Sequence, residues 1–204
     1  MTDYITLDAF KQRHGISQST NDYRIMEHIS AASAQVDEIT FRSFGPGTAG
    51  ARYFRPISCG FVRIDDAYSI TQVAVDDACN GTYSTVWAST DYETDPPNGI
   101  GPNGESGWPA EMLRAVGDVY SFPTWHRRSA VKVTATWGWA AVPAAVVEAT
   151  YLLTNRLYYE VAVPSGVTPP SADFGLPGST LQRPYTAERL LRPYMRASQT
   201  IGIA

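Results

Sequence analysis

The chain has 204 residues, a formal net charge of −4, 18% charged residues and 12% aromatic residues. Typical globular proteins have about 25% charged residues. Aromatic residues are enriched and Lys and Glu depleted at interface cores, so we expect partners to cover part of this surface. The negative charge and the absence of a basic run exclude avid binding to nucleic-acid phosphates, although DNA could still pass along such a surface.

Membrane and metal sites are not predicted. No stretch reaches the roughly 18 apolar residues of a membrane span, and the N-terminal residues lack the pattern of a signal peptide. We therefore expect a protein made and kept in a cytoplasm-like compartment. Cys59 and Cys79 lack CxxC spacing and a nearby His pair, so neither a metal nor a cofactor is expected. Two buried free thiols are favoured over a disulfide, because free Cys packs like a small hydrophobic residue.

Residues 1–44 are predicted to form two helices. Thr6 and Gly15 have the residue types of an N-cap and a C-cap for a short first helix. A longer helix is expected to begin at Asn21 or Asp22 and to run to about Ser43. Its apolar residues recur at spacings of three and four, which indicates one buried face. They are Ile25, Ile29, Ala32, Val36 and Ile39.

Residues 45–136 are predicted to form a β-rich region inserted between helices. Strands are expected at 61–64, 69–75 and 131–136. The Asn80-Gly81 pair indicates a hairpin turn, since both residues tolerate the positive φ of a type I′ turn, but the four residues before it allow a longer loop. The Pro-, Gly- and Asn-rich stretch 91–108 predicts a long surface loop, followed by a short segment at 110–116.

Residues 137–163 are predicted to join this sheet to a central helix. Trp137 and Trp139 have the two-residue spacing that puts both side chains on one face of a strand. Gly138 between them leaves room for a close backbone approach. We expect the two rings either to clamp the inserted region onto the helical core or to contact another subunit. Pro143 stands at the first turn of the following apolar helix, where its missing N–H costs nothing.

Residues 164–204 are predicted to form an extended linker and a C-terminal docking arm. The linker is rich in Pro, Gly and Ser, and it ends in an apolar segment that starts at Tyr185. Such a segment is expected to dock either on this chain or on another one. The predicted fold class is therefore α+β, with a helical core, an inserted β-rich region and an extended arm.

No motif makes a positive case for an enzyme. Asp65-Asp66 and Asp76-Asp77 are paired carboxylates, and two carboxylates across a sugar could hydrolyse a glycosidic bond. The simpler interpretation, which we favour, is that Asp caps turns by bonding the backbone. A carbohydrate-binding or glycan-acting domain is kept as the alternative function. Its sugar platform would use Trp87 and Trp108.

Four parts of the chain carry a resemblance to a known family. They are "ITLDAFKQRHGI" with "DYRIMEHISAASAQVDEITFRSF", "RYFRP" with "IDDAYSITQVAVDDACNGTYS", "VKVTATWGWAAVPAAVVEAT", and "ERLLRPYMR". Together they resemble the head-to-tail connector (adaptor) proteins of tailed bacteriophages, those of phages infecting actinobacteria most of all. In that family a strand meets a Gly-Trp and a Val-Pro before the last core helix, and the C-terminus is similar to Leu-Leu-x-Pro-Tyr.

The resemblance implies a structural virion protein and not an enzyme. About twelve copies would form a ring beneath the portal, extend the DNA channel and give a platform for the next neck protein. The partners implied are the portal protein, a downstream stopper or tail-terminator protein, and double-stranded DNA passing without specific binding. Assembly would occur in the host cytoplasm, and the isolated chain is expected to be a monomer. The residues implied in portal docking are Tyr185, Leu190, Leu191, Arg192, Pro193 and Tyr194.

Overall fold

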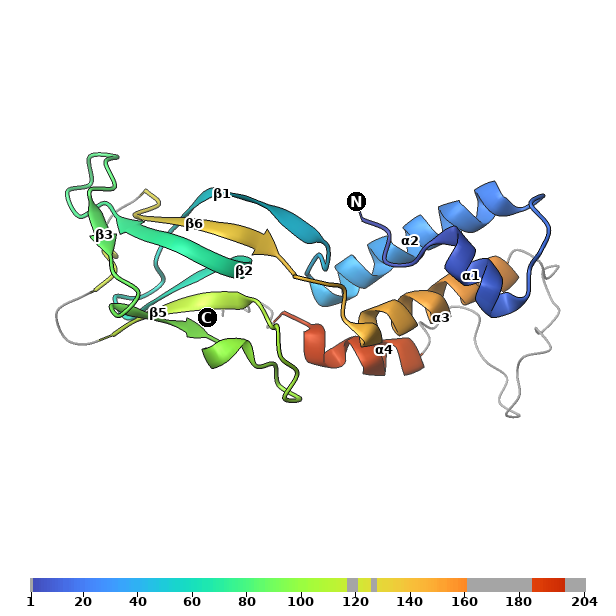
Figure 1. Cartoon of the computed structure of the whole chain (residues 1–204). Helices are drawn as coiled ribbons and strands as arrows, with labels where there is room; N and C mark the ends of the chain where they lie inside the picture. Colours follow the sequence, from blue (N-terminus) through green and yellow to red (C-terminus); the bar gives the residue numbers. More distant parts are fainter. Residues whose placement is uncertain (1, 117–120, 126–127, 161–184, 197–204) are drawn as a thin grey trace, which may run out of the picture. The chain divides into compact units, whose positions relative to one another are not determined.

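Figure 1 shows a computed structural model of the chain, which describes residues 2–116, 121–125, 128–160 and 185–196. The chain divides into two compact units, one formed by residues 1–44 with 142–204 and the other by residues 45–141. We call them the helical unit and the β unit. The predicted α+β class, with a β-rich region inserted into a helical one, is confirmed, while the linker at 164–184 lies outside the described residues.

The helical unit opens with α1 (Leu7–His14) and α2 (Asp22–Thr40). The predicted caps of α1 are confirmed: Thr6 Oγ1 accepts a hydrogen bond from the amide of Ala9 at 3.2 Å, and Gly15 has a φ of 64°. Helix α2 ends earlier than predicted, because Phe41 adopts a left-handed backbone with a φ of 53°. The apolar residues predicted for its buried face, Ile25, Ile29, Ala32, Val36 and Ile39, are all buried.

The described part of this unit contains three further elements: α3 (Ala144–Glu160), α4 (Tyr185–Leu191) and the 3₁₀ turn η2 (Arg192–Tyr194). Pro143 stands just before α3, and its carbonyl accepts the amides of Val146 and Val147 at 3.0 and 3.1 Å. Helix α3 packs against both α2 and α4. Its predicted place in the core is confirmed, because Val146, Thr150 and Leu153 are buried.

The described residues of the β unit form one sheet of six strands, in the order β1-β6-β2-β5-β4 with β3 also paired to β2. All of the pairings are antiparallel. Along β6, buried and half-buried residues alternate, as expected for a strand with one face on the core. The strands are β1 (Pro46–Phe54), β2 (Phe61–Val75), β3 (Thr85–Trp87), β4 (Tyr92–Asp95), β5 (Ala110–Ala115) and β6 (Val131–Gly138).

Strand β2 differs from the prediction of two separate strands. It is continuous across Asp65 and Asp66, and its register shifts between Arg63 and Ala67. The β2–β3 hairpin is confirmed, and its loop is longer than two residues, since Val75 pairs with Thr85.

The turn chemistry of this hairpin also differs from the prediction of a type I′ turn at Asn80-Gly81. The positive φ angles fall on Cys79 (55°) and Gly81 (87°) and not on Asn80. The buried carboxylate of Asp76 accepts the amides of Asn80 and Gly81 at 3.2 and 2.8 Å. The loop is therefore organised around an aspartate, which confirms the turn-capping interpretation for Asp76.

Residues 91–108 are not a simple surface loop. They contain β4 and the 3₁₀ turn η1 (Pro97–Gly99), and Ile100 forms a bridge with Ser106. The Pro- and Gly-rich composition of this stretch favours a loop, so β4 was not predicted. Its sequence signal is the alternation of Tyr92 and Thr94 with acidic residues.

Cys59 and Cys79 are free, as predicted, but both are exposed, so the prediction of buried thiols is wrong. Both lie outside the strands: Cys59 precedes β2 and Cys79 lies in the hairpin loop, where a free cysteine gains no core contact. Within the described part of the chain, no helix is long and apolar enough to cross a bilayer. Among the same residues, no cluster of His, Cys, Asp and Glu has the composition of a metal site.

Candidate functional site

Trp137, near the end of β6, fixes strand β1 to the sheet. Its side chain is 2% exposed and its ring centroid lies 5.6 Å from that of Phe54. The guanidinium of Arg52 lies 4.5 Å from the ring centroid, and the indole Nε1 donates to the carbonyl of Gly50 at 2.9 Å. Three residues of β1 thus depend on one side chain of β6, through packing, a cation–π contact and a hydrogen bond.

Trp139 has a different set of neighbours in the same unit. It is 4% exposed, its Nε1 donates to Asp66 Oδ2 at 3.0 Å, and its ring meets Trp108 edge to face with centroids 4.9 Å apart. The two-residue spacing predicted one shared face. Gly138 intervenes with a φ of 84°, so the regular alternation of a strand does not continue to Trp139.

The close backbone approach predicted at Gly138 is confirmed. A Cβ there would lie 2.5 Å from the carbonyl oxygen of Gly45, and a Cβ on Gly47 would lie 2.3 Å from the carbonyl oxygen of Trp137. The chain therefore needs glycine at both positions. That these residues and Pro143 join the two units, or contact another subunit, stays a prediction.

The two acidic pairs do not form a catalytic site. Asp65 is half-exposed and forms an ion pair with Arg52 at 2.7 Å, whereas Asp66 is buried and accepts from the indole of Trp139. Asp76 caps the hairpin loop, and Asp77 is exposed. Asp65, Asp66 and Asp76 each have a separate structural partner, and Asp77 is exposed, so the structure gives no support for two carboxylates that face each other across a cleft, as glycoside hydrolysis would require.

The two tryptophans predicted for a sugar platform are buried in the β unit. Trp87 is 5% exposed and stacks on Phe122 with ring centroids 4.5 Å apart. Trp108 is 6% exposed and packs against Trp139. A sugar needs an exposed ring face, and neither indole offers one. The glycan-acting alternative therefore loses the aromatic residues on which it was based.

The β unit has a shallow hollow of about 680 Å³ beside β4. Tyr68 and Tyr92 line it together with Trp108, and Glu93 supplies its only charged side chain. The lining includes no His, Cys, Lys or Arg. Its described lining therefore offers neither an acid–base pair nor an anion site.

The C-terminal segment docks on the helical unit of its own chain. Leu191 and Tyr194 are buried, and the Tyr194 ring lies edge to face with Phe44 at a centroid distance of 5.9 Å. Arg42 Nε donates to the carbonyl of Tyr194, and the amide of Arg196 donates to the carbonyl of Thr40, both at 2.9 Å. Of the two predicted docking targets, the structure shows the chain itself.

The residues predicted for portal docking are thus divided. The side chains of Leu191 and Tyr194 are already buried, whereas Arg192 is exposed and Leu190 and Pro193 are half-buried. The sixth residue begins α4, and its side chain lies outside the described part. A portal-binding role for the exposed side of this segment stays a prediction.

Ionisable groups of the helical unit have structural partners. Tyr4 donates its hydroxyl hydrogen to Asp37 and accepts from the amide of Phe44 at 3.0 Å. Burial, with a smaller effect of the Asp37 hydrogen bond, raises the pKa of Tyr4 to about 12, and burial also raises the pKa of Asp37. Arg13 holds both carboxylate oxygens of Glu148 at 2.7 Å, and this hydrogen bonding lowers the pKa of Glu148.

The helical unit is expected to lose stability as the pH falls from 7 to 5. Burial lowers the pKa of His14 and of His28. Between the unfolded pKa of about 6.5 and the lower folded value, the unfolded chain binds more protons, so acid favours unfolding. The raised pKa of Asp37 acts in the opposite sense, and the lowered pKa of Glu148 adds to the loss mainly below about pH 5, because it lies under the unfolded value of 4.5.

Thermal melts followed by circular dichroism at 222 nm measure this effect. We expect the melting temperature to fall between pH 7 and pH 5, and each kcal/mol lost corresponds to about 2–4 °C in a chain of this size. The variant His28→Gln, which removes one of the two histidines, should show a smaller fall. A melting temperature that rises on acidification would show that other groups dominate.

Comparison with known proteins gives likenesses of fold. No family model matches the chain, and no curated protein matches it. One similar chain comes from the neck of an empty gene transfer agent particle, in a structure computed with C6 symmetry. Its superposition on this protein has a TM-score of 0.55 at 15% sequence identity and covers 98% of this chain and 93% of that one. A chain in the neck of the native particle, computed with C12 symmetry, has a TM-score of 0.52 at 15% identity, with coverages of 99% and 98%.

A third likeness is to a chain in the virion of the native gene transfer agent particle. Its TM-score is 0.51 at 17% identity, with 98% of this chain and 93% of that chain covered. The shared fold therefore extends over nearly the whole of each protein and includes both the helical and the inserted β parts.

Proposed function

We propose that this chain is a structural protein of the neck of a tailed bacteriophage or phage-like particle, where it acts as the head-to-tail adaptor. The observation that carries the proposal is the likeness to two neck chains over 98% or more of this chain. A fold with an inserted sheet, shared over the full length, is a more specific likeness than one helix bundle or one sheet. The sequence resemblance to phage adaptors supports the same role independently.

The proposed assembly is a ring of about twelve copies beneath the portal. The similar neck chains come from structures computed with C6 and C12 symmetry, which supports a ring of this order. A net charge of −4 suits a channel wall along which DNA passes without being held, because phosphate binding needs clustered cations. The portal lies above this ring, and a stopper or tail-terminator protein binds below it.

Exposed apolar side chains give the chain surfaces for such partners. On the helical unit, Tyr23 is 72% and Phe41 is 69% exposed, and on the β unit Ile57 is 60% exposed. In the free monomer these side chains face water. On a portal ring, many such contacts form at once and offset the cost of ordering each subunit.

The exposed side of α4 and η2 is the proposed portal contact, with Arg192 at its centre. Cutting the chain after Val163 would be a poor test, because it also removes Leu191 from the core of the helical unit. Replacing the exposed Arg192 leaves that core intact. It therefore separates portal binding from folding.

We expect Arg192→Glu to weaken binding to purified portal rings about tenfold or more, because it replaces a cation at the proposed contact by an anion. Co-sedimentation of the full chain with portal rings measures this. Arg63→Glu is the matched control, since Arg63 is an exposed arginine of strand β2 and lies outside the proposed contact. Equal binding by Arg192→Glu and wild type would remove the docking assignment, and a wild-type chain that never binds portals would remove the adaptor role.

A further inference from the structure

Residues 40–44 lead from α2 to the β unit, and residues from both ends of the described chain contact them; we call this stretch the junction. Phe44, the last helical-unit residue before the β unit, is fully buried. The hydroxyl of Tyr4 accepts its amide at 3.0 Å. The rings of Tyr4 and Tyr194 each meet its ring edge to face, with centroids 5.9 Å apart in both pairs. The place where the chain leaves the helical unit is thus fixed by distant parts of the sequence.

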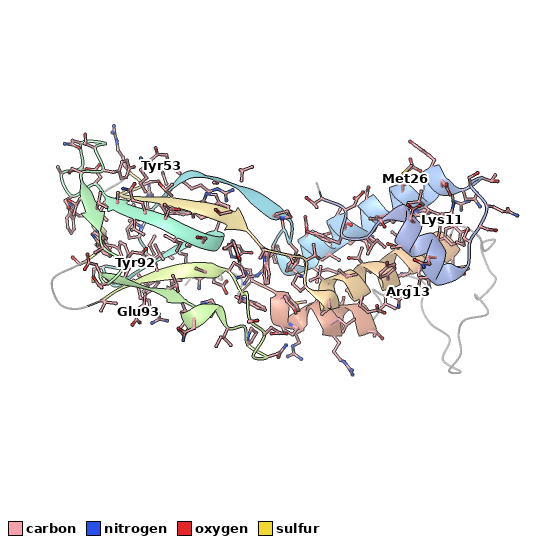
Figure 2. All side chains as sticks on the ribbon, in the orientation of Figure 1. Lys11, Arg13, Met26, Tyr53, Tyr92 and Glu93 are labelled. Carbon is pink, nitrogen blue, oxygen red and sulfur yellow. The ribbon has the colours of Figure 1, made fainter. Side chains whose placement is uncertain are left out.

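The C-terminal segment, residues 185–196, also bonds the backbone of the junction. Thr40 ends α2, and the carbonyl groups of a last helical turn have no partner within their helix. The amide of Arg196 supplies a partner to the carbonyl of Thr40 at 2.9 Å. In return, Arg42, which is 7% exposed, donates from Nε to the carbonyl of Tyr194 at 2.9 Å. Figure 2 shows this segment, as a pale red ribbon, beside the C-terminal end of α2.

The backbone of the junction is strained where it leaves α2. Phe41 has a φ of 53°, and its side chain is 69% exposed, so it adds little packing. A positive φ is unfavourable for a residue other than glycine, and it persists where surrounding contacts fix it. Two of those contacts, the ring of Tyr194 and the amide of Arg196, come from the C-terminal segment. The shape of the junction therefore depends on that segment.

The C-terminal segment is short enough to open by itself. Helix α4 has seven residues, and isolated helices of fewer than about 12 residues are marginal in water. Its place depends on packing against α2 and α3, with Ala187 and Leu191 buried. A segment of this kind opens locally at a lower free energy than the unfolding of a helical core. Its contacts with the junction are then lost together, because Tyr194 and Arg196 belong to one short segment.

We propose that the C-terminal segment is a latch on the junction. When it is docked, it fixes residues 40–44 and the point at which the β unit is joined to α2. When it opens, the junction becomes mobile while α1, α2 and α3 stay folded. A portal that binds the exposed side of the docked segment stabilises the docked form, because a ligand favours the state that it binds. Portal binding therefore closes the latch, a step that rests on the proposed function, whereas the latch itself does not.

Amide hydrogen exchange of the isotope-labelled full chain, followed by nuclear magnetic resonance, tests the latch without a portal. In the wild type, we expect the amides of Phe44 and Arg196 to have protection factors equal within about threefold, because one opening exposes both. The amide of Ile29, in the middle of α2, is expected to be protected about tenfold or more above them. Equal protection of all three amides would overturn the latch, because the segment would then open only with the whole unit.

The variant Tyr194→Ala removes the ring that packs on Phe44. We expect the amides of Phe44 and Arg196 to lose protection by the same factor, about tenfold or more. Met195→Ala is the matched control, since Met195 lies in the same segment with a side chain that is 39% exposed, and both amides should stay within about twofold of wild type. A Tyr194→Ala chain in which Arg196 loses its protection and Phe44 keeps it would overturn the proposal. If this variant does not fold, the wild-type comparison still decides.

Mass spectrometry of the same exchange reaction measures the effect of the portal. With purified portal rings, we expect deuterium uptake by residues 40–45 of the wild type to slow about threefold or more, and uptake by Arg192→Glu to stay unchanged. Rings that bind the wild type without slowing this uptake would overturn the closing of the latch. A wild type that never binds the rings removes the adaptor role, and the free-chain results then decide the latch alone.

Discussion

Replacing Trp137 with alanine is expected to destabilise the β unit by about 3–5 kcal/mol, the usual cost of removing a large buried aromatic side chain. The indole is 2% exposed and joins β6 to β1 through Phe54, Arg52 and the carbonyl of Gly50. Without it, the β1 edge loses the packing that holds it on the sheet. Urea unfolding followed by far-ultraviolet circular dichroism gives the change in free energy.

The matched control is Trp137→Phe, which keeps a large ring and loses the indole N–H. We expect it to cost about 1–2 kcal/mol, because one hydrogen bond and some ring area are lost. Both variants should also form fewer necks, in proportion to the fraction of unfolded chain. A Trp137→Ala protein that is as stable as wild type and assembles normally would contradict a structural role for this residue.

Replacing Leu191 with alanine is expected to destabilise the helical unit by about 2–5 kcal/mol. Its side chain is fully buried, and α4 packs against both α2 and α3. This loss of stability would show that the C-terminal segment is part of the fold of the free chain. Thermal or urea unfolding at 222 nm measures it, since the helices dominate that signal.

Arg189→Ala is the control for this prediction, because Arg189 is exposed on the same helix and surface substitutions usually change stability by less than about 0.5 kcal/mol. Equal stability of Leu191→Ala and wild type would show that α4 does not stay on the helical unit in solution. The segment would then be free to dock on a portal through its apolar side.

The helical unit could be predicted closely from the sequence because its signals are local. The caps at Thr6 and Gly15 and the apolar face of α2 require only the near neighbours of each residue. Pro143 marks the start of α3 for the same reason. The end of α2 was misplaced, since nothing in the sequence favours a left-handed backbone at Phe41.

The β unit was less predictable because its pairings join distant residues. Strand β4 forms because it pairs with β5, a contact that the local sequence does not show. The Pro- and Gly-rich residues around it therefore favoured the prediction of a loop, although Tyr92 to Asp95 alternate weakly. The buried carboxylate of Asp66 accepts a hydrogen bond from the indole of Trp139, which lies 73 positions later in the sequence. No local sequence pattern predicts such a contact. The two free cysteines are exposed because they lie in loops whose positions depend on the sheet.

The sequence resemblance and the fold comparison support the proposed neck role through different observations. The resemblance to phage adaptors depends on four sequence stretches spread over most of the chain, whereas the likeness to gene transfer agent chains depends on the backbone at 15–17% identity. A closer relation to adaptors of actinobacteriophages remains a prediction from the sequence.

Electron cryomicroscopy of particles that contain the wild-type chain, with no symmetry imposed on the neck, tests the central claim most directly. The account predicts a closed ring of about twelve copies between the portal and the next neck protein, each copy with the helical unit and the six-stranded sheet described above. Density for this fold elsewhere in the particle, or a neck that lacks it, would contradict the account.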